Sequence, residues 1–155
     1  MTVSRTRTMG LDVGERRIGM AIADELGMLA SPAGVVQRGE GDLQRIVEAA
    51  RAQGAGVIVI GLPTGMSGRE GPQAATVRAF AETLASASDG SLEIVFWDER
   101  LTSTMAERAL VAQGRKKSRR SGEIDAMAAA FILQGYLDAE RNSFRQRPSH
   151  GRDAQ

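Results

Sequence analysis

Cysteine is absent from this 155-residue chain, and the single histidine is His150, close to the C-terminus. The lack of cysteine excludes thiolate zinc sites, disulfide frameworks and cysteine nucleophiles, and the position of His150 argues against a histidine base. No apolar run approaches the ~20 residues that a membrane-spanning helix needs. The basic N-terminus is not followed by the apolar stretch of a signal peptide. We therefore expect a soluble, cytoplasmic protein without a membrane partner.

Neither sign of charge dominates, since the net charge is +1, but the cations are unevenly distributed. Residues 115–120 hold five cations in six positions, and residues 141–155 hold four arginines against one acid. Such clusters suggest an anionic partner, most commonly a phosphate backbone. A solvated loop explains residues 115–120 equally well. For residues 141–155 we favour a basic, disordered tail that follows a single domain over residues 1–140.

Hydrophobic periodicity predicts an α/β domain with a mixed five-stranded sheet flanked by helices. Alternating or wholly apolar runs predict strands, and apolar residues at helical spacing predict helices. Three antiparallel strands should come first and two parallel strands later, where strands alternate with helices. The predicted strands are 7–13, 18–23, a third within 29–37 that Pro32 and Gly34 weaken, 57–60 and 92–97, and the predicted helices are 41–53, 72–87, 103–113 and 122–139.

Asp12 is unusual because it lies in the middle of a predicted strand, where aspartate is depleted. Its neighbours on the same strand face are Gly10 and Gly14, so we expect the space above its carboxylate to be free of side chains. Such a space suits a metal ion or a closely approaching ligand. A carboxylate that only accepts hydrogen bonds from a neighbouring turn is the simpler alternative, and we consider it less favoured.

Glu99 and Asp98 directly follow a predicted buried strand, at the end where open α/β sheets place their ligands. An acid that merely begins a loop is equally ordinary there. The two side chains should point to opposite faces if strand geometry persists, so at most one of them joins Asp12, and the pattern alone does not decide which.

Asp125 shares a helical stripe with apolar residues that include Ile132 and Leu133. The stripe must face the core, so Asp125 should face the sheet. The alternative, an acid placed in the first turn by the helix dipole, explains Glu123 better than Asp125.

Three carboxylates that converge at one end of a sheet would repel one another, by about 4 kcal/mol per pair at ~4 Å and an effective dielectric of 20. Hard divalent cations such as Mg²⁺ or Mn²⁺ are the natural counter-ions. Such a cluster suits hydrolysis of phosphodiesters with two metal ions.

Five ordered motifs resemble the YqgF family, the Holliday-junction resolvases that are also described as nucleases maturing the precursor of small-subunit ribosomal RNA. The resemblance runs from about Thr8 to Asp138. The motifs are Gly10-Leu-Asp-Val-Gly-Glu-Arg-Arg-Ile-Gly19, Gly61-Leu-Pro63, Gly68-Arg-Glu-Gly-Pro72, Trp97-Asp-Glu-Arg-Leu-Thr-Ser103 and Ile124-Asp-Ala-Met-Ala-Ala-Ala-Phe-Ile-Leu-Gln134.

The resemblance implies a ribonuclease H-like fold and a metal-dependent endonuclease acting on Holliday-junction DNA or on the 5′ end of precursor 16S ribosomal RNA. It maps the catalytic, metal-binding acids onto Asp12, Glu99 and Asp125, and so favours Glu99 over Asp98. The nucleic-acid-binding residues that it implies are Arg16, Thr102, Arg115, Lys116, Lys117, Arg119 and Arg120. Ala126 departs from the family, where many relatives have a lysine or similar residue, which puts some substrate contacts in doubt.

Parts of the sequence also fit two other functions. The spacing of Gly14 and Gly19 resembles a phosphate-binding loop, but Met20-Ala21 follows where Lys-Ser/Thr is required. A non-catalytic nucleic-acid-binding adaptor on the same fold is the serious rival, and retention of all three acids argues against it. Junction resolution would favour a homodimer, since two strands need symmetric cuts, but the sequence leaves the oligomeric state open.

Overall fold

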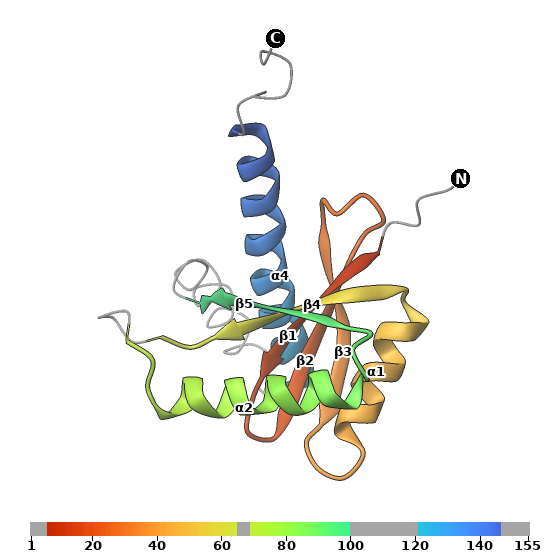
Figure 1. Cartoon of the computed structure of the whole chain (residues 1–155), viewed down its shortest axis with the longest axis vertical. Coiled ribbons are helices and arrows are strands. Elements are labelled where there is room, and N and C mark those ends of the chain that lie inside the picture. Colours follow the sequence, from red (N-terminus) through yellow and green to blue (C-terminus); the bar gives the residue numbers. More distant parts are fainter. Residues whose placement is uncertain (1–5, 65–68, 100–120, 147–155) are drawn as a thin grey trace.

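The computed structural model describes residues 6–64, 69–99 and 121–146 (Figure 1). A five-stranded sheet has the order β3-β2-β1-β4-β5. β2 is antiparallel to both β1 and β3, whereas β1, β4 and β5 run parallel to one another. The mixed sheet predicted from the sequence is therefore confirmed. The strands are β1 Arg7–Val13, β2 Arg17–Ala23, β3 Ala30–Gln37, β4 Ala55–Leu62 and β5 Glu93–Asp98.

Helices cover both faces of this sheet (Figure 1). α1, Asp42–Ala52, and α2, Pro72–Ala87, pack on one face, and α4, Ser121–Gln146, crosses the other. Strand alternation divides the core accordingly. Leu11 and Ile60 point into the α1/α2 layer, while Val59 and Ala21 point toward α4. In the described part of the chain, no helix is long and apolar enough to span a bilayer.

The predicted third strand forms despite its proline and glycine. β3 is an edge strand, paired only with β2 among the described strands, and an edge tolerates a residue that cannot donate to a ladder. Pro32 lies next to a register shift in the β2–β3 pairing, and Gly34 adopts φ 98°. The two residues thus coincide with an irregular stretch of pairing, but they do not end the strand.

The last helix is longer than predicted. α4 continues to Gln146, so residues 141–146, which we assigned to a disordered tail, are helical. The apolar stripe ends at Leu137, but Arg141 pairs with Asp138 one turn earlier, and such pairs stabilise helices. The predicted helix 103–113, the basic segment 115–120 and residues 147–155 lie outside the described residues.

Candidate functional site

The carboxyl ends of β1, β4 and β5 meet at one edge of the sheet, because these three strands are parallel. Asp12 is the penultimate residue of β1, and Glu99 directly follows β5. Gly61 of β4 lies between them. A Cβ at Gly61 would stand 2.8 Å from Oε1 of Glu99 and 2.6 Å from Ile132 of α4. The Glu99 side chain therefore lies over Gly61, on the α4 face of the sheet.

Asp125 reaches the same edge through the packing of α4 on β2. Gly19 is the direct partner of Asp12 in the β1–β2 ladder. A Cβ at Gly19 would lie only 1.9 Å from the backbone oxygen of Asp125. The first turns of α4 thus rest on bare backbone immediately beside Asp12. The structure brings together the three acids that the sequence singled out.

The glycines beside Asp12 do not leave the empty space that we expected. A Cβ at Gly10 would meet Cβ of Leu133 at 2.8 Å and the backbone oxygen of Ala129 at 2.9 Å. A Cβ at Gly14 would stand 2.7 Å from the backbone oxygen of Arg17. The space is filled by α4 and by the β1–β2 turn. Gly10 therefore permits close helix packing, and that part of the sequence argument was wrong.

The electrostatics of Asp12 reflect this crowded, acidic setting. Burial, followed by repulsion from Glu99 and then Asp125, raises the pKa of Asp12 from 3.8 to about 7. Burial, followed by repulsion from Asp98, also raises the pKa of Glu99. At neutral pH, Asp12 therefore holds a proton about half of the time when no cation is nearby.

Arg17 is a further member of the site that sequence reasoning missed. Its Nε donates a hydrogen bond to Oδ2 of Asp125 over 2.7 Å, and both side chains are 29% exposed. Arg17 begins β2 and shares a strand face with Gly19, under α4. Arg16, which we had expected to bind nucleic acid, is exposed in the preceding turn. The periodicity of β2 could have identified Arg17, had the strand been extended by one residue.

Asp98 is close enough to Glu99 to raise its pKa, but its own side chain bonds a residue just beyond β4. Its Oδ1 accepts a hydrogen bond from the hydroxyl of Thr64 over 2.7 Å. The remaining predicted nucleic-acid-binding residues, which are Thr102 and the five cations of 115–120, lie outside the described residues.

The donor set suits a hard divalent cation, although the side chains are not arranged around one. Oxygen ligands are what Mg²⁺ and Mn²⁺ prefer, and burial, together with repulsion from Glu99 and Asp125, raises the pKa of Asp12, so a nearby cation would favour its charged form. In residues 6–64, 69–99 and 121–146, however, no three His, Cys, Asp or Glu side chains are positioned to ligate one ion. Ligation would therefore require these side chains to turn toward the ion.

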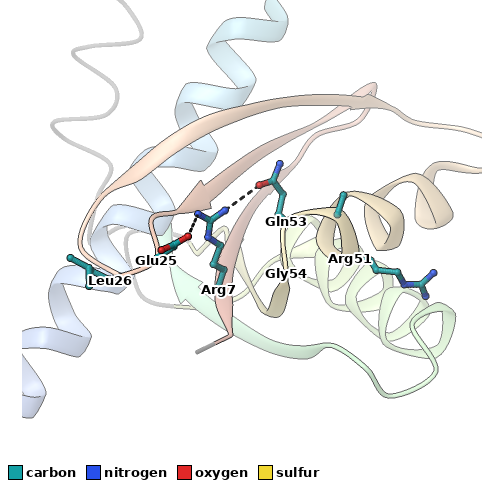
Figure 2. A pocket seen from close by; sticks show the side chains of 7 residues that line it. Arg7, Glu25, Leu26, Arg51, Gln53 and Gly54 are labelled. Atoms are coloured by element: carbon teal, nitrogen blue, oxygen red, sulfur yellow. Dashed lines mark hydrogen bonds and ion pairs between the residues drawn. The ribbon is translucent and has the colours of Figure 1, made fainter. Parts of the chain in front are cut away.

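A cavity of about 790 Å³ opens at the opposite end of β1 (Figure 2). Arg7 lies in its wall, where it bonds Gln53 over 3.4 Å and pairs with Glu25 over 3.6 Å. Asp12 stands five residues further along the strand, or roughly 17 Å away at ~3.3 Å per residue. This cavity is therefore separate from the acidic edge.

Comparison with known proteins identifies the family. The family model RuvX, described as Holliday junction resolvase, matches residues 6–139. A Symbiobacterium thermophilum protein named "Putative pre-16S rRNA nuclease" is 49% identical over 135 residues, covering 86% of this chain and 92% of the relative. A Brucella anthropi protein of the same name is 44% identical over 148 residues, covering 94% of this chain and 87% of the relative.

Solved structures show the fold independently. "T. thermophilus RuvC in complex with Holliday junction substrate" superposes with a TM-score of 0.57 at 14% identity, over 90% of this chain and 98% of that one. The fowlpox virus resolvase bound to Holliday junction DNA gives a TM-score of 0.54 at 6% identity, over 87% and 99%. The predicted ribonuclease H-like fold is thereby confirmed. From the sequence matches, the chain belongs to the RuvX (YqgF) family of Holliday-junction-resolvase-like nucleases.

Proposed function

We propose that this protein is a divalent-metal-dependent endonuclease that hydrolyses phosphodiester bonds in structured nucleic acid. The observation that supports this most directly is the placement of Asp12 between Glu99 and Asp125 at one sheet edge, with its pKa raised to about 7. A carboxylate whose charged form is disfavoured by burial and by neighbouring acids gains most from a bound cation. We assign these three acids as the catalytic and metal-binding residues.

The oxygens of Asp12, Glu99 and Asp125 would hold Mg²⁺ or Mn²⁺ at the carboxyl edge of β1 and β5. When bound there, the metal would lower the pKa of an attacking water and stabilise the developing negative charge on the leaving oxygen. The carboxylates orient the ion relative to the sheet, and α4 excludes water from the side that carries Leu133. Asp12, which lies between the other two acids and whose pKa is raised by burial and by repulsion from both of them, is the acid on which we expect catalysis to depend most.

For the substrate we propose precursor 16S ribosomal RNA first and Holliday-junction DNA second. The relatives named for precursor 16S RNA are 41–49% identical to this chain, whereas the resolvases with a solved structure are 6–15% identical. The family model nevertheless carries the junction-resolvase description, so both substrates belong in the test.

Cleavage assays on the two substrates test this proposal. We expect products with Mn²⁺ or Mg²⁺ and none with EDTA. Asp12→Asn should lower the rate about 10²–10³-fold, the usual cost of losing one preorganised electrostatic group, while nucleic-acid binding persists. Failure to cleave either substrate with either metal would refute the nuclease proposal and favour the non-catalytic adaptor.

The basic segment gives a separate test of nucleic-acid contact. We propose that residues 115–120, with Arg16 and Thr102, contact the phosphate backbone. Replacing Lys116 and Lys117 by Gln should flatten the salt dependence of binding by about two units of slope. Replacing Arg7 and Arg51, which line the cavity at the far end of β1 (Figure 2), makes the same charge change and should alter the slope much less. Equal slopes for both double variants would assign residues 115–120 to a solvated loop.

A further inference from the structure

A second cavity, of about 450 Å³, opens beside the carboxyl end of β1. Val13 and Gly14 form one of its walls, and they directly follow Asp12 in the chain. Successive side chains of a strand point to opposite faces of a sheet. Val13 accordingly packs in the α1/α2 layer, whereas the carboxylate of Asp12 faces α4. The cavity therefore adjoins the acidic site across the end of β1, on the other face of the sheet.

The guanidinium of Arg38, which directly follows β3, lines this cavity and is held in place there. Its Nη1 donates a hydrogen bond to the backbone oxygen of Gly14 over 2.9 Å. Its central carbon lies 5.2 Å from the centroid of the Phe80 ring, and its Nε pairs loosely with Asp42 over 3.5 Å. Among residues 6–64, 69–99 and 121–146, Nη2 has no hydrogen-bond or ion-pair partner. Arg38 thus keeps donors for a ligand in the cavity.

A guanidinium fixed in this way suits a phosphate group, because its planar fork of N–H donors matches phosphate oxygens and its charge is permanent. The first turn of α2, which has no side-chain cap, lines the same cavity through Gln73 and Thr76 and adds a weaker attraction for anions. Among the described residues in the wall, Glu15 alone is acidic, and it is exposed in the β1–β2 turn. Solvent therefore screens its repulsion of an anion.

We propose that this cavity binds a backbone phosphate of the substrate strand through Arg38, next to the phosphate that is cleaved at Asp12. The inference rests on the proposed nuclease function and adds a substrate contact to the same site. Consecutive phosphates of one strand are ~3.4 Å apart along the helix axis, close to the ~3.8 Å between consecutive Cα atoms. A strand with one phosphate at Asp12 thus brings its neighbour within reach of a cavity that begins at Val13. Arg38 would hold the strand across the end of β1.

Two matched pairs of variants separate this contact from the general charge of the surface. Arg38→Gln removes the cation of the cavity. Arg45→Gln makes the same charge change at an exposed arginine of α1, whose Nη2 bonds backbone oxygens at the same end of the sheet and which does not line the cavity. Glu15→Gln removes the acid of the cavity wall, and Glu40→Gln removes an exposed acid outside it.

Fluorescence anisotropy measures binding of a labelled four-way DNA junction and of a labelled precursor 16S RNA fragment, in EDTA and between about 50 and 200 mM salt. Arg38→Gln should weaken binding about tenfold, as loss of a charged hydrogen bond does, and flatten the salt dependence by about 0.7–0.9 units of slope. Arg45→Gln should have less than half of either effect. Glu15→Gln should tighten binding more than Glu40→Gln does. An Arg38 that only clamped Gly14 would affect stability and leave the salt slope unchanged.

A neutral methylphosphonate linkage, moved along the strand, distinguishes a backbone phosphate from free phosphate as the ligand. At one position it should weaken binding to the wild type about tenfold and leave binding to Arg38→Gln unchanged, because the contact is already lost there. No such position, equal effects of Arg38→Gln and Arg45→Gln, or equal effects of Glu15→Gln and Glu40→Gln would overturn the inference. A wild type that binds neither probe would refute the proposed nuclease function as well. The Glu15 and Glu40 pair decides the question even if Arg38→Gln fails to fold.

Discussion

Asp12 should destabilise the metal-free protein at neutral and alkaline pH, so Asp12→Asn should make the protein more stable while removing its activity. In the unfolded chain this carboxyl has an ordinary pKa of 3.8, whereas in the folded protein its pKa is about 7. Between these two values the folded state binds one more proton than the unfolded state. The contribution of Asp12 to the free energy of unfolding is therefore largest below about pH 4. It falls as the pH rises to about 7 and stays low at higher pH.

The size of the effect follows from the shift. About three pKa units at 1.36 kcal/mol per unit set an upper limit of about 4 kcal/mol. Asp12 is mostly but not completely buried, so solvent screening and rotation of the neighbouring acids reduce the cost. We expect Asp12→Asn to gain about 1–2 kcal/mol of unfolding free energy at pH 8, because the amide has no charge to desolvate. For a chain of this length, that corresponds to a rise in Tm of roughly 2–8 °C.

The measurement is urea unfolding of both proteins in EDTA at pH 4.5 and pH 8. The increase in unfolding free energy that Asp12→Asn gives over the wild type should be large at pH 8. It should be small at pH 4.5, because Asp12 of the folded wild type is already neutral there. Glu48→Gln, on the exposed side of α1, makes the same charge change and should show little pH dependence. Adding Mn²⁺ at pH 8 should stabilise the wild type more than Asp12→Asn. An Asp12→Asn protein less stable than the wild type at pH 8, or a gain equal at both pH values, would refute the reasoning.

Two further pairs of variants test the site and its support. Glu99→Gln should lower the cleavage rate about 10²–10³-fold, while Asp98→Asn should lower it less than tenfold; similar losses in both would contradict the assignment of Glu99 over Asp98. Gly19→Ala should destabilise the protein by about 1–3 kcal/mol, as overpacking does, because its Cβ would lie 1.9 Å from the backbone oxygen of Asp125. A Cβ added at Gly71 would meet no heavy atom within 4 Å, so Gly71→Ala should lower the unfolding free energy by less than about 1 kcal/mol, measured by urea unfolding. Equal losses of stability in Gly19→Ala and Gly71→Ala would contradict the packing argument.

Asp125 could be predicted because a helical stripe relates it to residues that must be buried. Ile132 and Leu133 are 4% and 0% exposed. Asp125 lies on the same face of α4 as these two residues and therefore faces the sheet. Asp12 was also placed on the correct face by strand alternation, although the empty space expected above its carboxylate was wrong. Periodicity reports orientation well because it depends only on geometry within one element.

The residues on one face of a strand do not show which other element packs against that face. Gly10 and Gly19 are bare positions in strands, and a bare position fits either an open ligand site or a helix that packs very closely. Only the tertiary structure shows that α4 occupies both positions. The same limit applies to Arg17: starting β2 at Ile18 left Arg17 in the turn, whereas the strand begins one residue earlier. One residue of boundary error was enough to hide a direct contact to Asp125.

The close packing of α4 and the proximity of the acids have one structural cause. Because Gly10, Gly19 and Gly61 lack side chains, the helix backbone approaches the sheet closely enough to bring Asp125 beside Asp12 and to let Glu99 lie over β4. The apolar contacts of Leu133 and its neighbours in α4 offset the repulsion that this approach creates. A larger residue at any of these glycines would relieve the electrostatic strain by moving the acids apart, and it would dismantle the site in doing so. Stability in the absence of metal and the capacity to hold metal therefore oppose each other at this edge of the sheet.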